Sequence, residues 1–254
     1  MHDGGTTDRR AAGARGAVDD PVSRRKSLVN TVADDLFDRI VAGEIGPGDP
    51  LPSEAEIGEQ FDVSRVTVRE ALRTLSTRGI VRVVSGIGSR VAPVEAWRSV
   101  PDALRYRAAH GDDATVSEQL ISTRRLIECE AAALAAPLIS DAALDDCEAC
   151  IAAMVQASEA ADVDAFVASD LRFHAVILEA SGNLFLAVLL APLTEVLADR
   201  RTETSRVPEI QQHAIVEHRA IVAALRSRDS DRARSAMEHH LQQTLDDLRR
   251  YILP

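Results

Sequence analysis

The 254-residue chain has few aromatic residues, few cysteines and no long apolar run. Aromatic residues make up 3% of the sequence while hydrophobic residues make up 46%, so the cores must be built mainly from Leu, Ile, Val and Ala. Three cysteines are an odd number, and a chain of this length does not need disulfides. No stretch is long and apolar enough to cross a bilayer, and the N-terminus lacks the apolar centre of a signal peptide. We therefore expect a cytoplasmic protein.

The net charge of −11 is unevenly distributed along the chain. Residues 24–94 contain equal numbers of basic and acidic side chains, and nearly all of the excess acid lies after Val94. The length allows one large domain or two ordinary ones. A neutral module can still bind phosphate if its arginines share one face, and its affinity should then fall as the salt concentration rises.

Residues 64–75 predict a short helix with one basic and one apolar face. Ser64 is a favourable N-cap, because its hydroxyl can accept from a free amide of the first turn. The spacing of three and four residues separates a basic set, Arg65, Arg69 and Arg73, from an apolar set, Val68, Leu72 and Leu75. A DNA major groove accepts such a helix, although an arginine stripe by itself is more often a solvated surface.

The flanking segments favour DNA binding over a solvated surface. Ser53 and Glu56 form a capping box for a helix that ends near Phe61, and only a tight turn separates that helix from Ser64. Two short helices joined in this way are typical of a helix-turn-helix, in which the second helix is the recognition helix. Downstream, two strand-like segments around a glycine-rich turn predict a β-hairpin wing.

We therefore expect a mainly α fold, with an N-terminal winged helix-turn-helix, a small β-hairpin wing and a C-terminal all-α bundle of six or seven helices. Asn30 or Thr31 is expected to cap the first helix. The predicted divisions are a disordered tail at 1–26, the winged helix-turn-helix at 27–93, a linker at 94–101 and the helical domain at 102–254. Three tail residues leave open an auxiliary DNA-binding arm, namely Arg9, Arg10 and Arg15.

Polar residues interrupt the apolar stripes of the C-terminal helices. Arg124 stands where Leu is expected, and a buried guanidinium needs an anionic partner. Four further residues lie on the apolar stripes of three later helices: Asp170, His174, His218 and His240. A single inward histidine is usually a satisfied core residue. Three of them with an inward aspartate can share a cavity, and these ligand types suit Zn, with Ni, Mn or Fe as alternatives.

The remaining histidines and cysteines carry weaker signals. His213 and His239 lie off the apolar stripes and are expected to be solvated. Cys147 and Cys150 have the C-x-x-C spacing, but they fall on a helical segment without a second pair. We expect small core or surface residues there, with a redox or zinc role as the minor alternative.

The N-terminal motifs resemble those of the GntR family of bacterial transcription regulators. The segments G-E-I-G-P-G-D-P-L-P-S-E, V-S-R-V-T-V-R-E-A-L-R-T-L and G-I-G-S-R-V carry the resemblance over nearly the whole module. In that family, residues at five matching positions contact DNA. The resemblance therefore implies DNA contacts from Ser64, Arg65, Thr67, Arg69 and the wing-tip Gly86.

The C-terminal segment resembles the FCD ligand-sensing domain of the FadR subfamily. The motifs are Arg124-x-x-x-Glu128, Asp170-x-x-Phe173-His174, Glu217-His218 and His240-Leu241. The resemblance implies a divalent metal held by Asp170, His174, His218 and His240, with a small carboxylic acid beside it. Arg124 is the candidate for holding that carboxylate, because its planar fork suits bidentate pairing. A structural salt bridge to Glu128 is the alternative.

These features predict a transcription regulator, not an enzyme. One recognition helix reads few base pairs, so we expect a homodimer on a palindromic double-stranded operator. We expect a repressor whose effector is a small carboxylate such as a sugar acid, a hydroxy acid or a dicarboxylate. The alternatives are a regulator whose metal is itself the signal, a domain used only for dimerisation, and an enzyme whose metal activates water. Four protein ligands crowd the metal and no separate base or nucleophile motif occurs, which argues against the enzyme.

Overall fold

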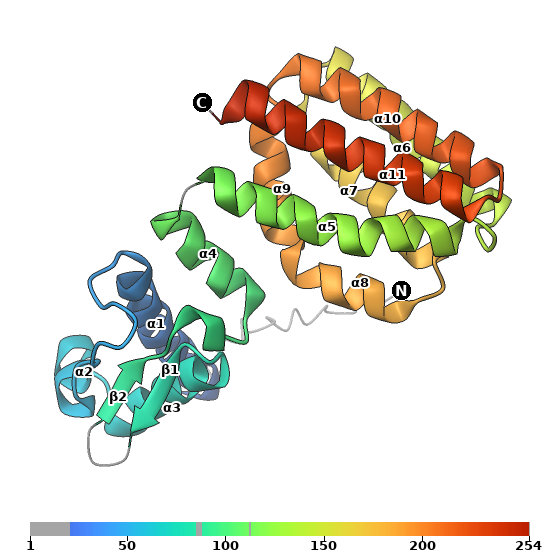
Figure 1. The fold of residues 1–254 in the computed structure, drawn as a ribbon. Coiled ribbons are helices and arrows are strands. Elements are labelled where there is room, and N and C mark those ends of the chain that lie inside the picture. Colours follow the sequence, from blue (N-terminus) through green and yellow to red (C-terminus); the bar gives the residue numbers. More distant parts are fainter. Residues whose placement is uncertain (1–20, 85–87, 112, 254) are drawn as a thin grey trace, which may run out of the picture.

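The computed structural model describes residues 21–84, 88–111 and 113–253, which form two lobes joined by one helix (Figure 1). The N-terminal lobe contains α1 (Pro21–Val41), α2 (Glu54–Phe61), α3 (Arg65–Thr77), β1 (Val81–Val84) and β2 (Gly88–Val91). Helix α4 (Val100–His110) connects the lobes. The C-terminal lobe contains α5 (Asp113–Ala135), α6 (Asp141–Glu159), α7 (Val163–Ala180), α8 (Leu184–Leu190), α9 (Thr194–Thr204), α10 (Pro208–Arg226) and α11 (Ser230–Asp247). The predicted winged helix-turn-helix and all-α domain are confirmed.

The first helix starts earlier than the sequence predicted. α1 begins at Pro21, not after Asn30 or Thr31, so the end of the segment predicted as a disordered tail is helical. Proline favours the first helical position, because its fixed φ matches the helix and its missing N–H would have no partner there. The rest of the predicted tail, including its three arginines, lies outside the described residues. None of the described helices is long and apolar enough to cross a membrane.

Local capping sets the geometry of the helix-turn-helix. The Ser53 hydroxyl accepts from the Glu56 amide at 3.3 Å, and the Glu56 carboxylate accepts from the Ser53 amide at 2.7 Å. Asp62, with φ of 49°, ends α2 in the left-handed conformation and turns the chain sharply. Ser64 then caps α3 by accepting from the Thr67 amide at 3.2 Å. The predicted capping box and N-cap are therefore both present.

The hairpin stands beside the recognition helix. β1 and β2 are antiparallel, with Val81 opposite Val91 and Val84 opposite Gly88. Val81 and Val91 are buried in the core of the N-terminal lobe, whereas Val83, two residues further along the same face of β1, is 70% exposed. The hairpin is thus anchored in the core at its base, and β1 leaves the core toward its C-terminal end.

The C-terminal lobe is a helical bundle in which α5, α6, α7, α10 and α11 share one core. Large side chains that meet there are Met154 of α6, Phe173 of α7, Ile221 of α10 and Met237 of α11. The chain after Asn183 forms two helices, α8 and α9, separated by a 3₁₀ turn at Ala191–Leu193. Pro192 stands near the start of that turn, where its missing N–H interrupts the helical hydrogen bonding.

Helix α4 contacts both lobes. Much of the predicted linker is structured, since a 3₁₀ turn covers Val94–Ala96 and α4 begins at Val100. Trp97 and Tyr106 pack against the core of the N-terminal lobe, whereas Leu104 packs against a cluster of the C-terminal lobe. The Trp97 ring centroid lies 5.9 Å from that of Phe37 and 5.3 Å from that of Tyr106.

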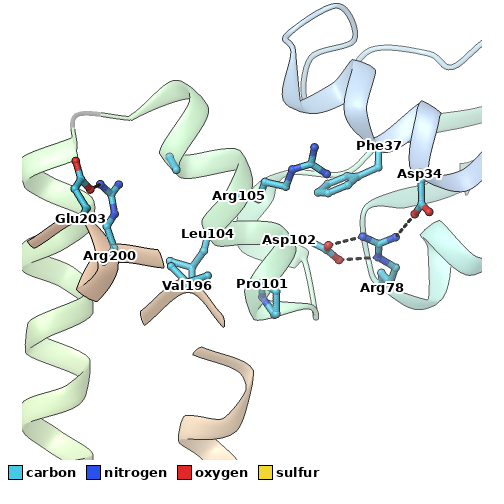
Figure 2. A pocket seen from close by; sticks show the side chains of 11 residues that line it. Asp34, Phe37, Arg78, Pro101, Asp102, Leu104, Arg105, Val196, Arg200 and Glu203 are labelled. Atoms are coloured by element: carbon cyan, nitrogen blue, oxygen red, sulfur yellow. Dashed lines mark hydrogen bonds and ion pairs between the residues drawn. The ribbon is translucent and has the colours of Figure 1, made fainter. Parts of the chain in front are cut away.

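An ion pair ties α4 to the end of the recognition helix (Figure 2). Arg78, the C-cap of α3, donates from Nε to Asp102 Oδ2 at 2.6 Å and from Nη2 to Asp102 Oδ1. Gly79 adopts φ of 79°, and a Cβ there would lie 2.7 Å from the Ala96 carbonyl oxygen. Only glycine therefore lets the chain after α3 approach the linker so closely.

Candidate functional site

The basic face of α3 is open to solvent. Ser64, Arg65 and Arg69 are exposed. Thr67 is half-buried, and its Oγ1 lies 3.0 Å from Ser64 Oγ. Arg73 is also exposed, so the three arginines share the solvent side of the helix as their spacing predicted. The fifth predicted DNA-contacting residue, Gly86, lies outside the described residues.

A groove of about 710 Å³ separates α3 from the wing, and Arg69, Arg73 and Ser89 are among its lining residues. Glu54 at the start of α2 holds Arg69, since the Arg69 Nε lies 2.9 Å from Glu54 Oε2. Sequence reasoning did not single out Val66, which is 71% exposed in the first turn of α3. Val66 lies off the apolar stripe of α3, and this position could have marked it as a candidate for DNA contact. An exposed apolar residue there suits contact with a thymine methyl group.

The three inward histidines meet in the C-terminal lobe. His174 on α7, His218 on α10 and His240 on α11 place ligand atoms within 4.8 Å of one another. Asp170, one turn before His174, points its Oδ1 at the cluster, 3.4 Å from His218 Nε2 and 3.9 Å from His174 Nε2. All four residues are buried. The structure thus brings together the complete ligand set predicted from the sequence.

Neighbouring side chains orient two of these imidazoles. His174 Nδ1 lies 2.6 Å from Glu128 Oε2, and His218 Nδ1 lies 3.3 Å from Met154 Sδ. Each ring therefore turns its Nε2 toward Asp170, and neither Nε2 has a hydrogen-bond partner among the described residues. Buried nitrogen atoms without partners are costly, so a cation at this position fits the residues present.

Arg124 and Glu128 form the salt bridge that was the alternative to carboxylate binding. Arg124 Nε donates to Glu128 Oε1 at 2.7 Å, and both side chains are almost fully buried. The second oxygen of Glu128 contacts His174, so this carboxylate connects the guanidinium to the histidine cluster. Arg124 Nη2, however, has no hydrogen-bond partner among the described side chains. The salt bridge therefore leaves one edge of the guanidinium unused.

Sequence reasoning missed Arg201. It lies on α9 and places its Nε 2.7 Å from Asp170 Oδ2. Its Nη2, like that of Arg124 and like Ser117 Oγ, is buried with no hydrogen-bond partner in the described part of the chain. All three residues line one cavity of about 40 Å³, and Arg201 connects that cavity to Asp170 of the cluster. No periodic pattern marks Arg201 as inward, because α9 has no clear apolar stripe in the sequence.

Burial and pairing fix the charges of the cluster. Burial lowers the pKa of His218 to about 3, and the pKa of His240 is also held well below its usual value by burial. Burial alone would raise the pKa of Glu128, but Arg124 and His174 outweigh it and hold that pKa well below its usual value. Burial would likewise raise the pKa of Asp170, but Arg201 and His174 outweigh it, and the pKa of Asp170 is lowered. His218 and His240 thus present neutral imidazole beside ionised carboxylate, which is the state that binds metal.

The remaining candidates have structural surroundings. Cys147 is packed in the core, and burial raises the pKa of its thiol to about 12. Burial also raises the pKa of the Cys150 thiol. His213 and His239 lie outside the cluster, where they pair with Asp247 at 2.9 Å and with Glu217 at 2.7 Å. The raised pKa values indicate unreactive thiols.

Comparisons with known proteins match both lobes. The model of the family "Bacterial regulatory proteins, gntR family" matches residues 28–91, and that of the FCD domain matches residues 119–243. Over 85% of its length, the chain is 30% identical to the uncharacterised HTH-type transcriptional regulator YieP of Escherichia coli K12, of which it covers 94%. It is 33% identical to the HTH-type transcriptional repressor NanR of Citrobacter rodentium, covering 85% of this chain and 84% of NanR. These relatives are regulators, not enzymes.

The fold is also similar to a solved structure from Listeria monocytogenes. That protein, Lar, controls the expression of the agr system and mediates virulence in that organism. The two chains superpose with a TM-score of 0.61 at 20% sequence identity, over 88% of this chain and 97% of the other. This likeness supports the two-lobed fold.

The lowered pKa of His218 predicts that the metal-free protein loses stability as the pH falls from 7 to 5. In the unfolded chain this imidazole gains a proton near pH 6.5, whereas in the folded protein it remains neutral down to about pH 3. The unfolded state therefore binds more protons in this window, and one such group lowers the free energy of unfolding by about 2 kcal/mol at pH 5. Urea denaturation of the chelated protein at both pH values measures this loss.

The His218→Gln variant removes the titrating group and is expected to lose less stability between pH 7 and pH 5. The control is His239→Gln, since His239 is exposed and lies outside the cluster. Glu128 and Asp170 do not confuse the comparison, because carboxylates with lowered pKa values lose their contribution only below their ordinary pKa values of 4.5 and 3.8. An equal loss in wild type and His218→Gln would contradict the prediction.

Proposed function

The chain belongs to the GntR family of bacterial regulatory proteins and is a transcriptional regulator with an FCD domain. We propose that it is a repressor controlled by a small carboxylic acid. The acid binds beside a divalent metal ion in the C-terminal lobe. One observation carries the proposal: Arg201 connects a buried cluster of three histidines and an aspartate to a cavity with two unpaired guanidinium nitrogens. The name of the relative NanR supports the sign of regulation.

The metal ligands we propose are Asp170, His174, His218 and His240. Their nitrogen and oxygen donors suit Zn, with Ni, Mn or Fe as alternatives. A bound cation would supply positive charge that attracts a carboxylate. Glu128 would act through His174, because its Oε2 lies 2.6 Å from His174 Nδ1 and so favours the ring orientation that leaves Nε2 for the metal.

Three groups are placed to bind the acid. The Nη2 atoms of Arg124 and Arg201 and the hydroxyl of Ser117 line the same cavity, and none has a hydrogen-bond partner among the described residues. Two guanidinium edges beside a metal favour a small anion such as a sugar acid, a hydroxy acid or a dicarboxylate. Arg124 can therefore have both of the roles considered from the sequence. Its Nε forms the salt bridge with Glu128, and its Nη2 is free to bind the carboxylate of the acid.

The size of the cavity links acid binding to movement. About 40 Å³ is room for about one water molecule, so a carboxylic acid must displace part of the wall. Helix α9 supplies much of that wall through Leu197, Arg201 and Thr204. We infer that the acid shifts α9, which the Arg201–Asp170 pair holds in place when the acid is absent.

An adjacent side of α9 faces the junction between the lobes, and Arg200 lines both the small cavity and the cleft at this junction. Val196, Arg200 and Glu203 line a cleft of about 530 Å³ with Leu104 of α4 and Arg78 at the end of α3 (Figure 2). Because Asp102 ties α4 to Arg78, a shift of α9 reaches the recognition helix through few contacts. In a homodimer on a palindromic operator, such a shift changes the spacing of the two recognition helices and hence the affinity.

Metal content tests the carrying observation. The purified, unchelated protein is expected to contain about one divalent metal ion per chain by elemental mass spectrometry. The His218→Ala/His240→Ala variant is expected to contain none, because it loses two of four ligands. A matched control, His213→Ala/His239→Ala, removes two histidines outside the cluster and should retain the metal. Absence of metal from wild type would contradict the site. If metal removal alone releases the operator, the metal itself is the signal.

Operator binding tests the recognition surface. Arg69→Ala is expected to weaken binding to a palindromic operator selected from random DNA by about 10-fold or more and to reduce the slope of affinity against salt concentration. The substitution removes a positive charge from the solvent-facing side of α3, where the Arg69 side chain is 69% exposed. Arg232→Ala is the control, because that side chain is 73% exposed on α11. Fluorescence anisotropy gives both affinities, and equal losses would contradict the assignment.

Coupling is tested with lactate, gluconate and succinate as probes. At least one acid is expected to weaken operator binding about 5-fold to 150-fold, the usual range of allosteric coupling. Arg201→Met should abolish acid binding, measured by thermal shift. Asp102→Asn should keep acid binding but lose much of the effect on the operator, because its tie to Arg78 is weakened.

The control for the junction is Glu95→Gln. This substitution breaks an exposed ion pair between Glu95 and Arg107 of α4. It should leave the coupling unchanged. The proposed path is wrong if Asp102→Asn couples as strongly as wild type. The proposed effector class is wrong if none of the acids that bind changes operator affinity.

A further inference from the structure

The recognition helix α3 exposes one apolar side chain, that of Val66, which is 71% exposed. The structure describes every residue of this helix, and its other exposed residues are all charged or polar: Arg65, Arg69, Glu70, Arg73 and Thr77. A single exposed valine is common on protein surfaces, so its exposure alone indicates nothing. The position of Val66 on the helix is what gives it a role.

Val66 projects from the side of α3 that faces away from the core of the lobe. The buried side of the helix is formed by Val68, Ala71, Leu72 and Leu75. An α-helix turns by about 100° per residue, which places Val66 opposite the middle of that buried set. Any surface that covers the outer side of α3 therefore contacts Val66.

The surface that covers this side is DNA. A recognition helix enters the major groove with its N-terminal residues against the base edges, and Val66 is the second residue of α3. The first turn is fixed by the Ser64 hydroxyl, which accepts from the Thr67 amide at 3.2 Å. A valine in a helix has one strongly preferred rotamer, so its two methyl groups are held in place before DNA binds.

The chemistry of valine limits what it can recognise. Its side chain neither donates nor accepts a hydrogen bond. Among the groups that base pairs present in the major groove, the C5 methyl group of thymine is the apolar one. The hydrogen-bonding groups of the base edges would lose water against a valine without gaining a partner. Valine at this position therefore favours a thymine methyl group.

We propose that Val66 is a specificity-determining residue that contacts the C5 methyl group of one thymine in each operator half-site. The inference goes beyond the proposed function, because it depends on DNA binding and not on the acid or the metal. The exposed arginines of α3 can bind phosphates and guanine. Val66 adds a preference at one base pair that those arginines do not supply.

Substitution of deoxyuridine for thymine tests the inference, because it removes the methyl group and keeps the hydrogen-bonding groups of the base. Each thymine of the palindromic operator selected from random DNA is replaced in turn, in both half-sites at once. Affinity is measured by fluorescence anisotropy without added acid. At one position wild type is expected to bind about 10-fold more weakly, since burying one methyl group contributes about 4-fold in each half-site.

The variant Val66→Ala removes both methyl groups of the side chain. It should fold normally, because Val66 is exposed and alanine has the higher helix propensity, and circular dichroism checks this. The variant is expected to bind the thymine and deoxyuridine operators equally. Val83→Ala is the matched control, since Val83 is 70% exposed on β1 of the same lobe and its variant should keep the wild-type ratio of affinities.

The base 5-methylcytosine separates a methyl contact from an effect of DNA shape. With a C·G pair at the identified position, wild type is expected to bind the methylated form about 10-fold more tightly than the unmethylated form. Val66→Ala should bind both forms equally. The inference is overturned if no thymine methyl group contributes to the affinity of wild type, or if Val66→Ala keeps the wild-type ratio.

Failure of the inference and failure of the proposed function give different results. If the inference alone fails, the selected operator still binds wild type and still responds to the acid. If the proposed control by an acid fails, the methyl effect and its loss in Val66→Ala are still measured, because no acid is present in that experiment. A wild type that binds no selected DNA overturns both.

Discussion

Compensation of buried charge is the constraint on which the C-terminal lobe depends. Arg124, Glu128, Asp170 and Arg201 are all enclosed in a helical core where an unpaired charge would be strongly destabilising. Glu128 lies between Arg124 and His174, and Asp170 lies between Arg201 and the imidazole nitrogens. Each carboxylate is thus held ionised, and His174 and His218 are oriented with their Nε2 atoms toward Asp170. The same network leaves two guanidinium edges unpaired, and they meet in one small cavity.

In the proposed function, sensing and transmission lie on the same short helix. Arg201 of α9 reaches Asp170 in the histidine cluster, while Arg200 beside it lines the cleft toward α4. α4 in turn is fixed to the recognition helix by Asp102 and by the packing of Trp97 and Tyr106 on the N-terminal core. Because packed helices move as units, we propose that a displacement at one end of this series is carried to the other end.

Features set by local chemistry could be predicted from the sequence. The capping box of Ser53 and the N-cap of Ser64 depend on residues three positions apart, and both form as expected. The inward positions of Asp170, His174, His218 and His240 followed from helical periodicity alone. The start of α1 at Pro21 was missed, because the preceding composition resembles a flexible tail and outweighed the single signal of the proline.

The sequence by itself determined the recognition helix, the wing, the helical class of the second lobe and the residue types of the histidine cluster, since these depend on spacing along one element. Only the tertiary structure decided which elements meet. Arg201 is drawn to Asp170 across the bundle, and Asp102 to Arg78 across the junction, although neither pair is close in sequence. Such contacts depend on how helices pack in three dimensions, and no periodicity within α4 or α9 specifies which charges on other helices they face.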